Sequence, residues 1–94
     1  METYLIEVPH EATEAACANA VRIFLETGSH FLANADWGCE DDEHKAWLLV
    51  DVDNRQQALH IIPPGLRANA RIVKLRKFTR EDIKEYLETG YIKP

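Results

Sequence analysis

The sequence predicts an α+β fold in which helices cover one face of a four-stranded antiparallel sheet. Segments that alternate apolar and polar residues are expected to be strands, because successive strand side chains face opposite sides. Segments with apolar residues at three- and four-residue spacing are expected to be amphipathic helices. These segments follow one another as strand, helix, strand, strand, helix, strand, with an extra helix at the end. A chain of 94 residues fits a single domain over residues 1–94.

The first strand is expected over residues 3–8 and the first helix over residues 11–27. Alternation puts Tyr4, Ile6 and Val8 on one face of the strand and Leu5 and Glu7 on the other. The apolar stripe of the helix is Ala16, Cys17, Ala20, Val21, Phe24 and Leu25. A glycine at position 28 supplies the helix stop.

Residues 30–52 are interpreted as a hairpin, with strands over 30–37 and 45–52 and an acidic loop between them. In the second strand the apolar side is Ala46, Leu48, Val50 and Val52, with Trp47, Leu49 and Asp51 opposite. In the first strand Phe31, Ala33, Ala35 and Trp37 are expected on one face, and His30, Leu32, Asn34 and Asp36 on the other. The hairpin therefore has one apolar face and one face that carries both apolar and polar residues.

The second half continues with a helix, a strand and a further helix. The helix is expected to be capped by Asp53, with Ala58, Leu59 and Ile62 on its core side, and to end at the two prolines that follow. The strand covers residues 71–78 with Val73 and Leu75 toward the core and Ile72, Lys74 and Arg76 opposite. Thr79 and Asp82 resemble a capping box for the last helix, whose stripe is Ile83, Tyr86 and Leu87 and whose stop is Gly90.

This βαββαβ order with an extra C-terminal helix is the ferredoxin-like arrangement. Over nearly the whole chain it resembles the superfamily of ferredoxin-like dimeric α+β barrels, which includes muconolactone isomerases and small cofactor-free monooxygenases. The resemblance is architectural and implies a homodimer, with no activity attached to it. A dimer also suits the face that no helix covers, because Leu5, Leu32, Trp47 and Leu49 would otherwise form an exposed apolar patch.

The same uncovered face carries the candidates for ligand binding and catalysis. Glu7, Asn34, Asp36 and Trp47 are the candidate ligand-binding residues, the alternative being an ordinary solvated sheet face. Pairing within the hairpin has two registers that keep the faces matched. One sets Asp36 against Trp47 and Leu32 against Asp51; the other sets His30 against Asp51. In the second register His30 and Asp51 would form a candidate catalytic pair for general base chemistry, or a structural ion pair.

The acidic loop suggests a metal site. Cys39 and His44 lie within it, and His10 follows the first strand, so the three side chains are chemically suited to zinc, nickel or copper. Neighbouring acids are expected to raise the pKa of the Cys39 thiol, whereas a bound cation would deprotonate it. The alternative is a solvated acidic hairpin, because the spacing matches no standard motif.

Composition excludes several partners. A net charge of −5 argues against nucleic acid, and the longest apolar run, residues 46–50, is far shorter than the roughly 20 residues of a membrane helix. No export signal is recognisable, and two cysteines fit reduced thiols in a cytoplasm. The expected function is binding of a small polar ligand or a divalent transition metal by a cytoplasmic homodimer. The alternative is a cofactor-free isomerase or monooxygenase.

Overall fold

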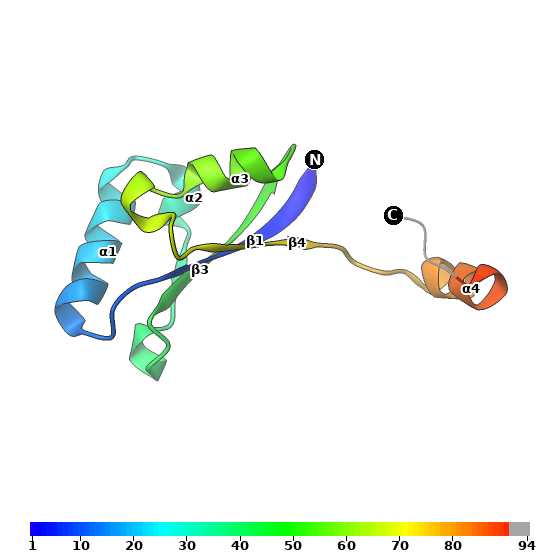
Figure 1. Ribbon diagram of the computed structural model, residues 1–94, viewed down its shortest axis with the longest axis horizontal. Coiled ribbons are helices and arrows are strands. Elements are labelled where there is room, and N and C mark those ends of the chain that lie inside the picture. Colours follow the sequence, from blue (N-terminus) through cyan, green and yellow to red (C-terminus); the bar gives the residue numbers. More distant parts are fainter. Residues whose placement is uncertain (91–94) are drawn as a thin grey trace.

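The computed structural model describes residues 1–90, in which a four-stranded antiparallel sheet is combined with four helices (Figure 1). The strands are β1 (Glu2–Pro9), β2 (Asp36–Trp37), β3 (Lys45–Val52) and β4 (Arg71–Leu75). The helices are α1 (Glu14–Glu26), α2 (His30–Ala33), α3 (Arg55–Ile61) and α4 (Arg80–Thr89). The strand order is β2-β3-β1-β4, and each neighbouring pair is antiparallel. The predicted α+β class and antiparallel sheet are confirmed.

The core lies on one face of the two central strands, β1 and β3. Its strand residues, each at most 4% exposed, are Tyr4, Ile6, Val8, Ala46, Leu48 and Val50. Helix α1 adds Phe24 to the same cluster, and α3 with its C-terminal end adds Ala58 and Ile62. The faces predicted for β1 and β3 are therefore confirmed, and α1 and α3 cover the same side of the sheet because both contribute to one cluster.

The opposite side of the sheet is called the open face here and consists of three cross-strand rows. The middle row is Val73, Leu5 and Leu49. The row toward the β2–β3 loop is Arg71, Glu7, Trp47 and Asp36, and the row at the other end is Leu75, Thr3 and Asp51. Leu49 is 68% exposed, so apolar side chains on this face meet solvent.

The strand predicted over residues 30–37 is wrong. Residues His30–Ala33 form the short helix α2, and only Asp36 and Trp37 pair with β3. The helix places Leu32 in the core at 2% exposure, with Phe31 and Ala35 packed beside it, whereas Ala33 is exposed. Apolar residues at 31, 32 and 35 suit one face of a helical turn as well as they suit a strand, so alternation alone did not distinguish the two.

The facing of β4 is also the reverse of the prediction. Ile72 lies opposite Ile6 and packs against the core, whereas Val73 and Leu75 lie opposite Leu5 and Thr3 on the open face. The Arg55 guanidinium donates to the Ile72 carbonyl at 2.6 Å, which attaches β4 to α3. Two adjacent apolar residues start this strand, so the pattern allowed both facings. The strand ends at Leu75, three residues earlier than expected.

Smaller corrections concern the helix ends. Thr13 caps α1 by accepting from the Ala16 amide at 3.0 Å. Asn54, not Asp53, caps α3 by accepting from the Gln57 amide at 2.9 Å. Leu25, assigned to the buried stripe of α1, is 60% exposed.

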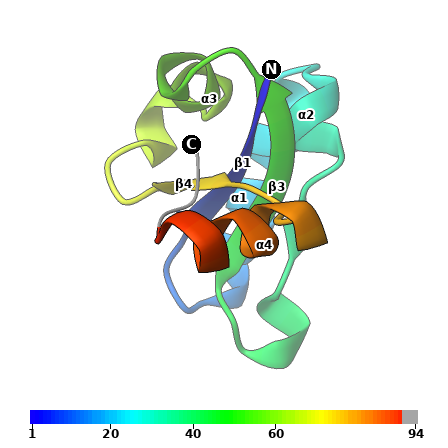
Figure 2. The ribbon, with the colours of Figure 1, turned by 90° about the vertical axis from the view of Figure 1, so that its right-hand side faces the viewer.

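Helix α4 stands apart from the rest of the chain at the end of an extended segment (Figure 1), and Figure 2, which looks along the long axis of the molecule, shows α4 from the side in front of the other elements. The predicted capping box between Thr79 and Asp82 is confirmed, as is the left-handed Gly90 that closes the helix. The molecule extends over 54 × 27 × 21 Å, which reflects this projection. None of the helices in residues 1–90 has the length and apolar content that a membrane span requires.

Candidate metal centre

Three residues far apart in the sequence meet where β1 ends. His10 follows β1, and Cys39 and His44 lie in the loop between β2 and β3. The antiparallel register sets Pro9 opposite Lys45, and the His10 amide donates to the His44 carbonyl at 3.0 Å. One potential ligand atom from each of His10, Cys39 and His44 lies within 4.8 Å of the other two. The structure thus brings together the three residues predicted as metal ligands.

The ring of His10 is oriented as a metal ligand would be. Its Nδ1 lies 2.9 Å from the Glu11 carbonyl oxygen, and because a carbonyl only accepts, Nδ1 carries the proton. The other nitrogen, Nε2, then accepts from the Cys39 thiol at 3.1 Å. Histidine ligands in metalloproteins usually have this arrangement: one ring N–H donates to a carbonyl or carboxylate, and the other ring nitrogen binds the metal through its lone pair.

His44 has the complementary orientation. Its Nε2 lies 3.3 Å from a carboxylate oxygen of Asp42, to which it donates. In the neutral imidazole Nδ1 then carries the lone pair, and this atom is buried with no hydrogen-bond partner among the described residues. A buried acceptor without a partner is rare and costs free energy. The site consequently contains a nitrogen lone pair whose natural partner is a proton donor or a cation.

Cys39 is accompanied by the second thiol of the chain. Burial, followed by interaction with the Cys17 thiol, raises the pKa of Cys39 to about 11. The direction agrees with the expectation from sequence, but the cause differs, since the loop acids play no part. Both cysteines are partly buried and neither forms a disulfide. Without a cation, Cys39 is a neutral thiol and a poor nucleophile.

A series of ring contacts links this cluster to the core. The Phe24 and Trp37 rings lie 4.8 Å apart, the Trp37 and His10 rings 6.1 Å apart, and the His10 and His44 rings 5.7 Å apart. Phe24 belongs to the buried core of α1. The two histidines are therefore held by packing that continues into the interior, as a preorganised site requires.

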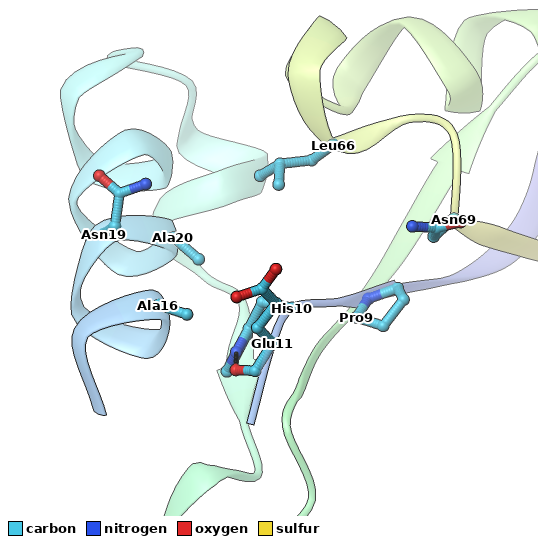
Figure 3. A pocket seen from close by; sticks show the side chains of 8 residues that line it. All are labelled: Pro9, His10, Glu11, Ala16, Asn19, Ala20, Leu66 and Asn69. Carbon is cyan, nitrogen blue, oxygen red and sulfur yellow. Dashed lines mark hydrogen bonds between the residues drawn. The ribbon is translucent and has the colours of Figure 1, made fainter. Parts of the chain in front are cut away.

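An open cleft of about 630 Å³ adjoins the cluster. Figure 3 shows His10 and Glu11 at its base, between α1 on one side and Leu66 and Asn69 on the other. A second, smaller cavity of about 340 Å³ also adjoins the cluster, and its walls include Cys17, Cys39 and His44.

Three of the four candidate ligand-binding residues, Glu7, Asp36 and Trp47, lie next to one another on the open face. Trp47 donates its indole N–H to Glu7 at 3.2 Å, and Lys45 lies 3.5 Å from the same carboxylate oxygen. Asp36 pairs with Trp47 in the strand register, which is the first of the two predicted registers. Asn34 is not part of this group, because its amide donates to the His30 carbonyl within α2 at 2.7 Å.

The His30–Asp51 pair is wrong. His30 lies in α2, with its ring 4.3 Å from the Phe31 ring. Asp51 lies on β3, where it accepts from the Thr3 hydroxyl. The register that would have joined them required a strand at residue 30, and that strand is absent from the described chain. Leu32, assigned with Leu5, Trp47 and Leu49 to a subunit contact, is buried in the core of its own chain.

Sequence reasoning missed that Cys17 lies beside Cys39 and His44. The helical stripe placed this cysteine correctly on the side of α1 that faces the sheet, beside Ala20 and Phe24. What the stripe did not reveal is that the end of β1 and the acidic loop lie beneath the same side of α1, so that the two cysteines share one cavity. Comparison of the chain with family models, curated proteins and solved structures gives no match.

Proposed function

We propose that this protein binds a divalent transition metal of the zinc class through His10, Cys39 and His44. The observation that carries the proposal is the buried Nδ1 of His44, a lone pair without a partner in the described structure, in a cluster of three ligand-type residues. Two imidazoles and a thiol are ligands that zinc prefers, and nickel and copper also take them.

The geometry favours a tetrahedral ion. Zinc bonds of about 2.0–2.3 Å put neighbouring ligand atoms roughly 3.3–3.8 Å apart. Cys39 and His10 already approach to 3.1 Å, and the full set lies within 4.8 Å. Closing around an ion therefore needs only side-chain adjustments, since the backbone is fixed by the hydrogen bond from His10 to His44. The ion would replace the thiol proton on Cys39.

Zinc titration tests the proposal. Excess Zn²⁺ is expected to raise the melting temperature on the order of 10–20 °C at about 100 times the dissociation constant, because a ligand bound only to the folded state stabilises it. His44→Ala and Cys39→Ala are expected to remove this rise. His60→Ala, which removes an exposed histidine of α3, is the matched control and should keep it. A wild-type protein without a zinc-dependent shift would overturn the proposal, as would a His44→Ala variant that keeps all of it.

The relation to the ferredoxin-like dimeric α+β barrels is also a proposal. The strand order β2-β3-β1-β4 supports it, with α1 connecting β1 to β2 and α3 connecting β3 to β4. Helix α2 in place of most of the second strand is the main departure from a regular version of that fold. The associated alternative, a cofactor-free isomerase or monooxygenase, gains no support from the site, because His30 and Asp51 do not meet.

A reducing location such as the cytoplasm fits the metal proposal. Thiolate ligands bind metal only when they are not joined in a disulfide, and Cys17 and Cys39 are both free thiols although they share a cavity. Purification without reductant, followed by a thiol count, would reveal any tendency of the pair to oxidise.

A further inference from the structure

We propose that Cys17 is the fourth ligand of the metal centre, which makes it a closed Cys2His2 zinc site with no coordination position left for a substrate. This inference rests on the metal binding proposed above and extends it from three ligands to four. It assigns the centre a structural role, because catalytic zinc sites keep one position open for water or substrate.

The position of Cys17 supports this assignment. Cys17 lies one turn into α1, where its amide donates to the Thr13 carbonyl at 3.0 Å. The sheet-facing side of α1 carries Cys17 over the loop between β2 and β3, so Cys17, Cys39 and His44 line one cavity of about 340 Å³.

Two carboxylates line the same cavity and are the competing ligands. Glu14 and Glu40 both contribute to its wall, but both are exposed to solvent, whereas Cys17 is partly buried. A thiolate also suits a zinc-class ion better than a carboxylate does when cysteine and histidine already form the rest of the site.

The closed centre would tie three segments together. His10 lies at the end of β1, Cys17 in α1, and Cys39 and His44 in the loop between β2 and β3. The amphipathic helix packs on the sheet mainly through Ala20 and Phe24, which leaves its first turns with small side chains. A metal bound at this end would therefore stabilise the N-terminal turns of α1, which make the fewest large apolar contacts with the core.

Thiol protection in the wild-type protein separates this inference from the metal proposal. The chain has two cysteines, and an alkylating reagent followed by mass mapping reports on each of them. With Zn²⁺ bound, both thiols are expected to be protected. Protection of Cys39 alone would overturn the Cys17 assignment and leave metal binding intact. Protection of neither thiol would overturn both.

Variants give a second readout. Cys17→Ala is expected to weaken Zn²⁺ binding at least about tenfold, and Glu14→Gln, on the same helix turn, should leave it unchanged. With Co²⁺ as the probe, the sulfur-to-metal charge-transfer absorption of Cys17→Ala should fall to about half that of the wild type, because one of two thiolates is lost. An unchanged band in this variant would contradict the assignment.

We infer independently that α4 is the docking element of a homodimer, with the α4 of each copy lying on the open face of the other. Within residues 1–90 of one copy, neither surface is covered. On α4, Ile83, Tyr86 and Leu87 are 46%, 47% and 78% exposed, and on the sheet Leu49 is 68% exposed. Figure 1 shows α4 held away from the sheet by the segment that follows β4.

Charge argues for a second copy of this chain as the occupant. Arg80 and Lys84 lie on the flank of the α4 stripe next to Ile83 and Leu87, given 3.6 residues per turn. On the open face, Asp36 and Asp51 flank the apolar row that contains Leu49. The two basic side chains of α4 would thus meet these two carboxylates. A twofold exchange would cover both apolar surfaces of both copies at once, as an isologous dimer requires.

Sedimentation equilibrium at high micromolar concentration tests the dimer. The wild type is expected to be a dimer, and Leu49→Asp and Leu87→Asp are each expected to be monomeric. Leu25→Asp, on α1 at 60% exposure, is the matched control and should remain dimeric. A monomeric wild type, or variants that stay dimeric, would overturn the inference.

Mixing the two variants identifies the partner surface. The exchanged dimer has two contacts, each formed by the α4 of one copy and the open face of the other. When a Leu49→Asp copy pairs with a Leu87→Asp copy, both substitutions fall in one of these contacts and the other contact is unchanged. Equimolar mixing should therefore restore a dimer with one intact contact. If Leu49→Asp dissociates the dimer and Leu87→Asp does not, the sheets pair directly and α4 is not the docking element. Failure of mixing to restore any dimer would contradict the exchange as well.

Discussion

Replacing Phe24 with Ala is expected to lower the free energy of unfolding by about 3–5 kcal/mol, the largest stability effect anticipated for a single substitution in this chain. Phe24 is 1% exposed and is one of the largest fully buried side chains. Its ring lies 4.8 Å from the Trp37 ring. Natural domains have about 5–15 kcal/mol of stability in total, so the variant would be partly unfolded at moderate temperature. Urea denaturation followed by circular dichroism measures the change.

The neighbouring residue provides the control. Leu25 differs from Phe24 by one position on the same helix but is 60% exposed, so Leu25→Ala is expected to change stability by no more than about 0.5 kcal/mol. Equal losses in the two variants would show that the assignment of the buried face of α1 is wrong. Because Trp37 also lies against His10, the Phe24 variant should show weaker zinc binding even where it remains folded.

The two central strands could be predicted from the sequence because one face of each lacks charged residues and the other face carries an acid. In β3, apolar Ala46 and Leu48 alternate with Trp47 and Leu49, and β1 repeats the contrast, so a slip by one residue would have buried Glu7 or Asp51. The cap of α4 could also be predicted, because Thr79 and Asp82 form a local motif that depends on no distant residue.

The other elements depended on tertiary contacts that local patterns do not encode. Residues 30–37 were expected to be a strand with Leu32 on the open face, yet Leu32 is buried because the segment turns as a helix against the core. In β4, adjacent Ile72 and Val73 allow two facings, and the pairing of Ile72 with Ile6 selects one of them. Propensity and periodicity are overridden wherever packing against a neighbour decides the outcome.

The candidate site was predictable in its residue types and only partly in its membership. Histidine and cysteine at positions 10, 39 and 44 indicated a metal before their proximity was known, since few other roles need those side chains near one acidic loop. The presence of Cys17 in the same cavity as Cys39 and His44 depends on how α1 crosses the end of the sheet, which the sequence pattern does not reveal. The site was expected on the open face and at its two ends, including the end with the acidic loop, and at that end α1 and the core residue Phe24 also approach the cluster from the covered side.

Gly38 is expected to be the residue of the loop that least tolerates a side chain. A Cβ at this position would lie 2.6 Å from Cζ3 of Trp47, 2.7 Å from the Glu43 carbonyl oxygen and 2.9 Å from the Glu43 Cβ. Such approaches are well inside van der Waals contact, so the loop or the indole must move. The Gly38 amide donates to the Lys45 carbonyl at 3.1 Å, and the Gly38 carbonyl accepts from the Asp41 and Glu43 amides at 3.0 Å each. The backbone is therefore fixed on both sides of the clash.

The indole has little room to move, because its N–H donates to Glu7 at 3.2 Å. Gly38→Ala is accordingly expected to cost about 1–3 kcal/mol of stability, as overpacking commonly does. The zinc-induced rise in melting temperature should also shrink, since Cys39 directly follows the displaced residue and His44 ends the same loop. Thermal denaturation with and without Zn²⁺ measures both effects.

Gly65→Ala is the matched control for this substitution, because a Cβ there meets no atom within 4 Å and its backbone is not left-handed. The control should be neutral or slightly stabilising, by up to about 1 kcal/mol, since alanine reduces the freedom of the unfolded chain. If Gly38→Ala were as stable as Gly65→Ala and kept the full zinc response, then Trp47 would not pack against the loop. Other contacts would in that case keep Cys39 and His44 close to His10. The ring contacts from Phe24 through Trp37 to His10 are the contacts that could do so.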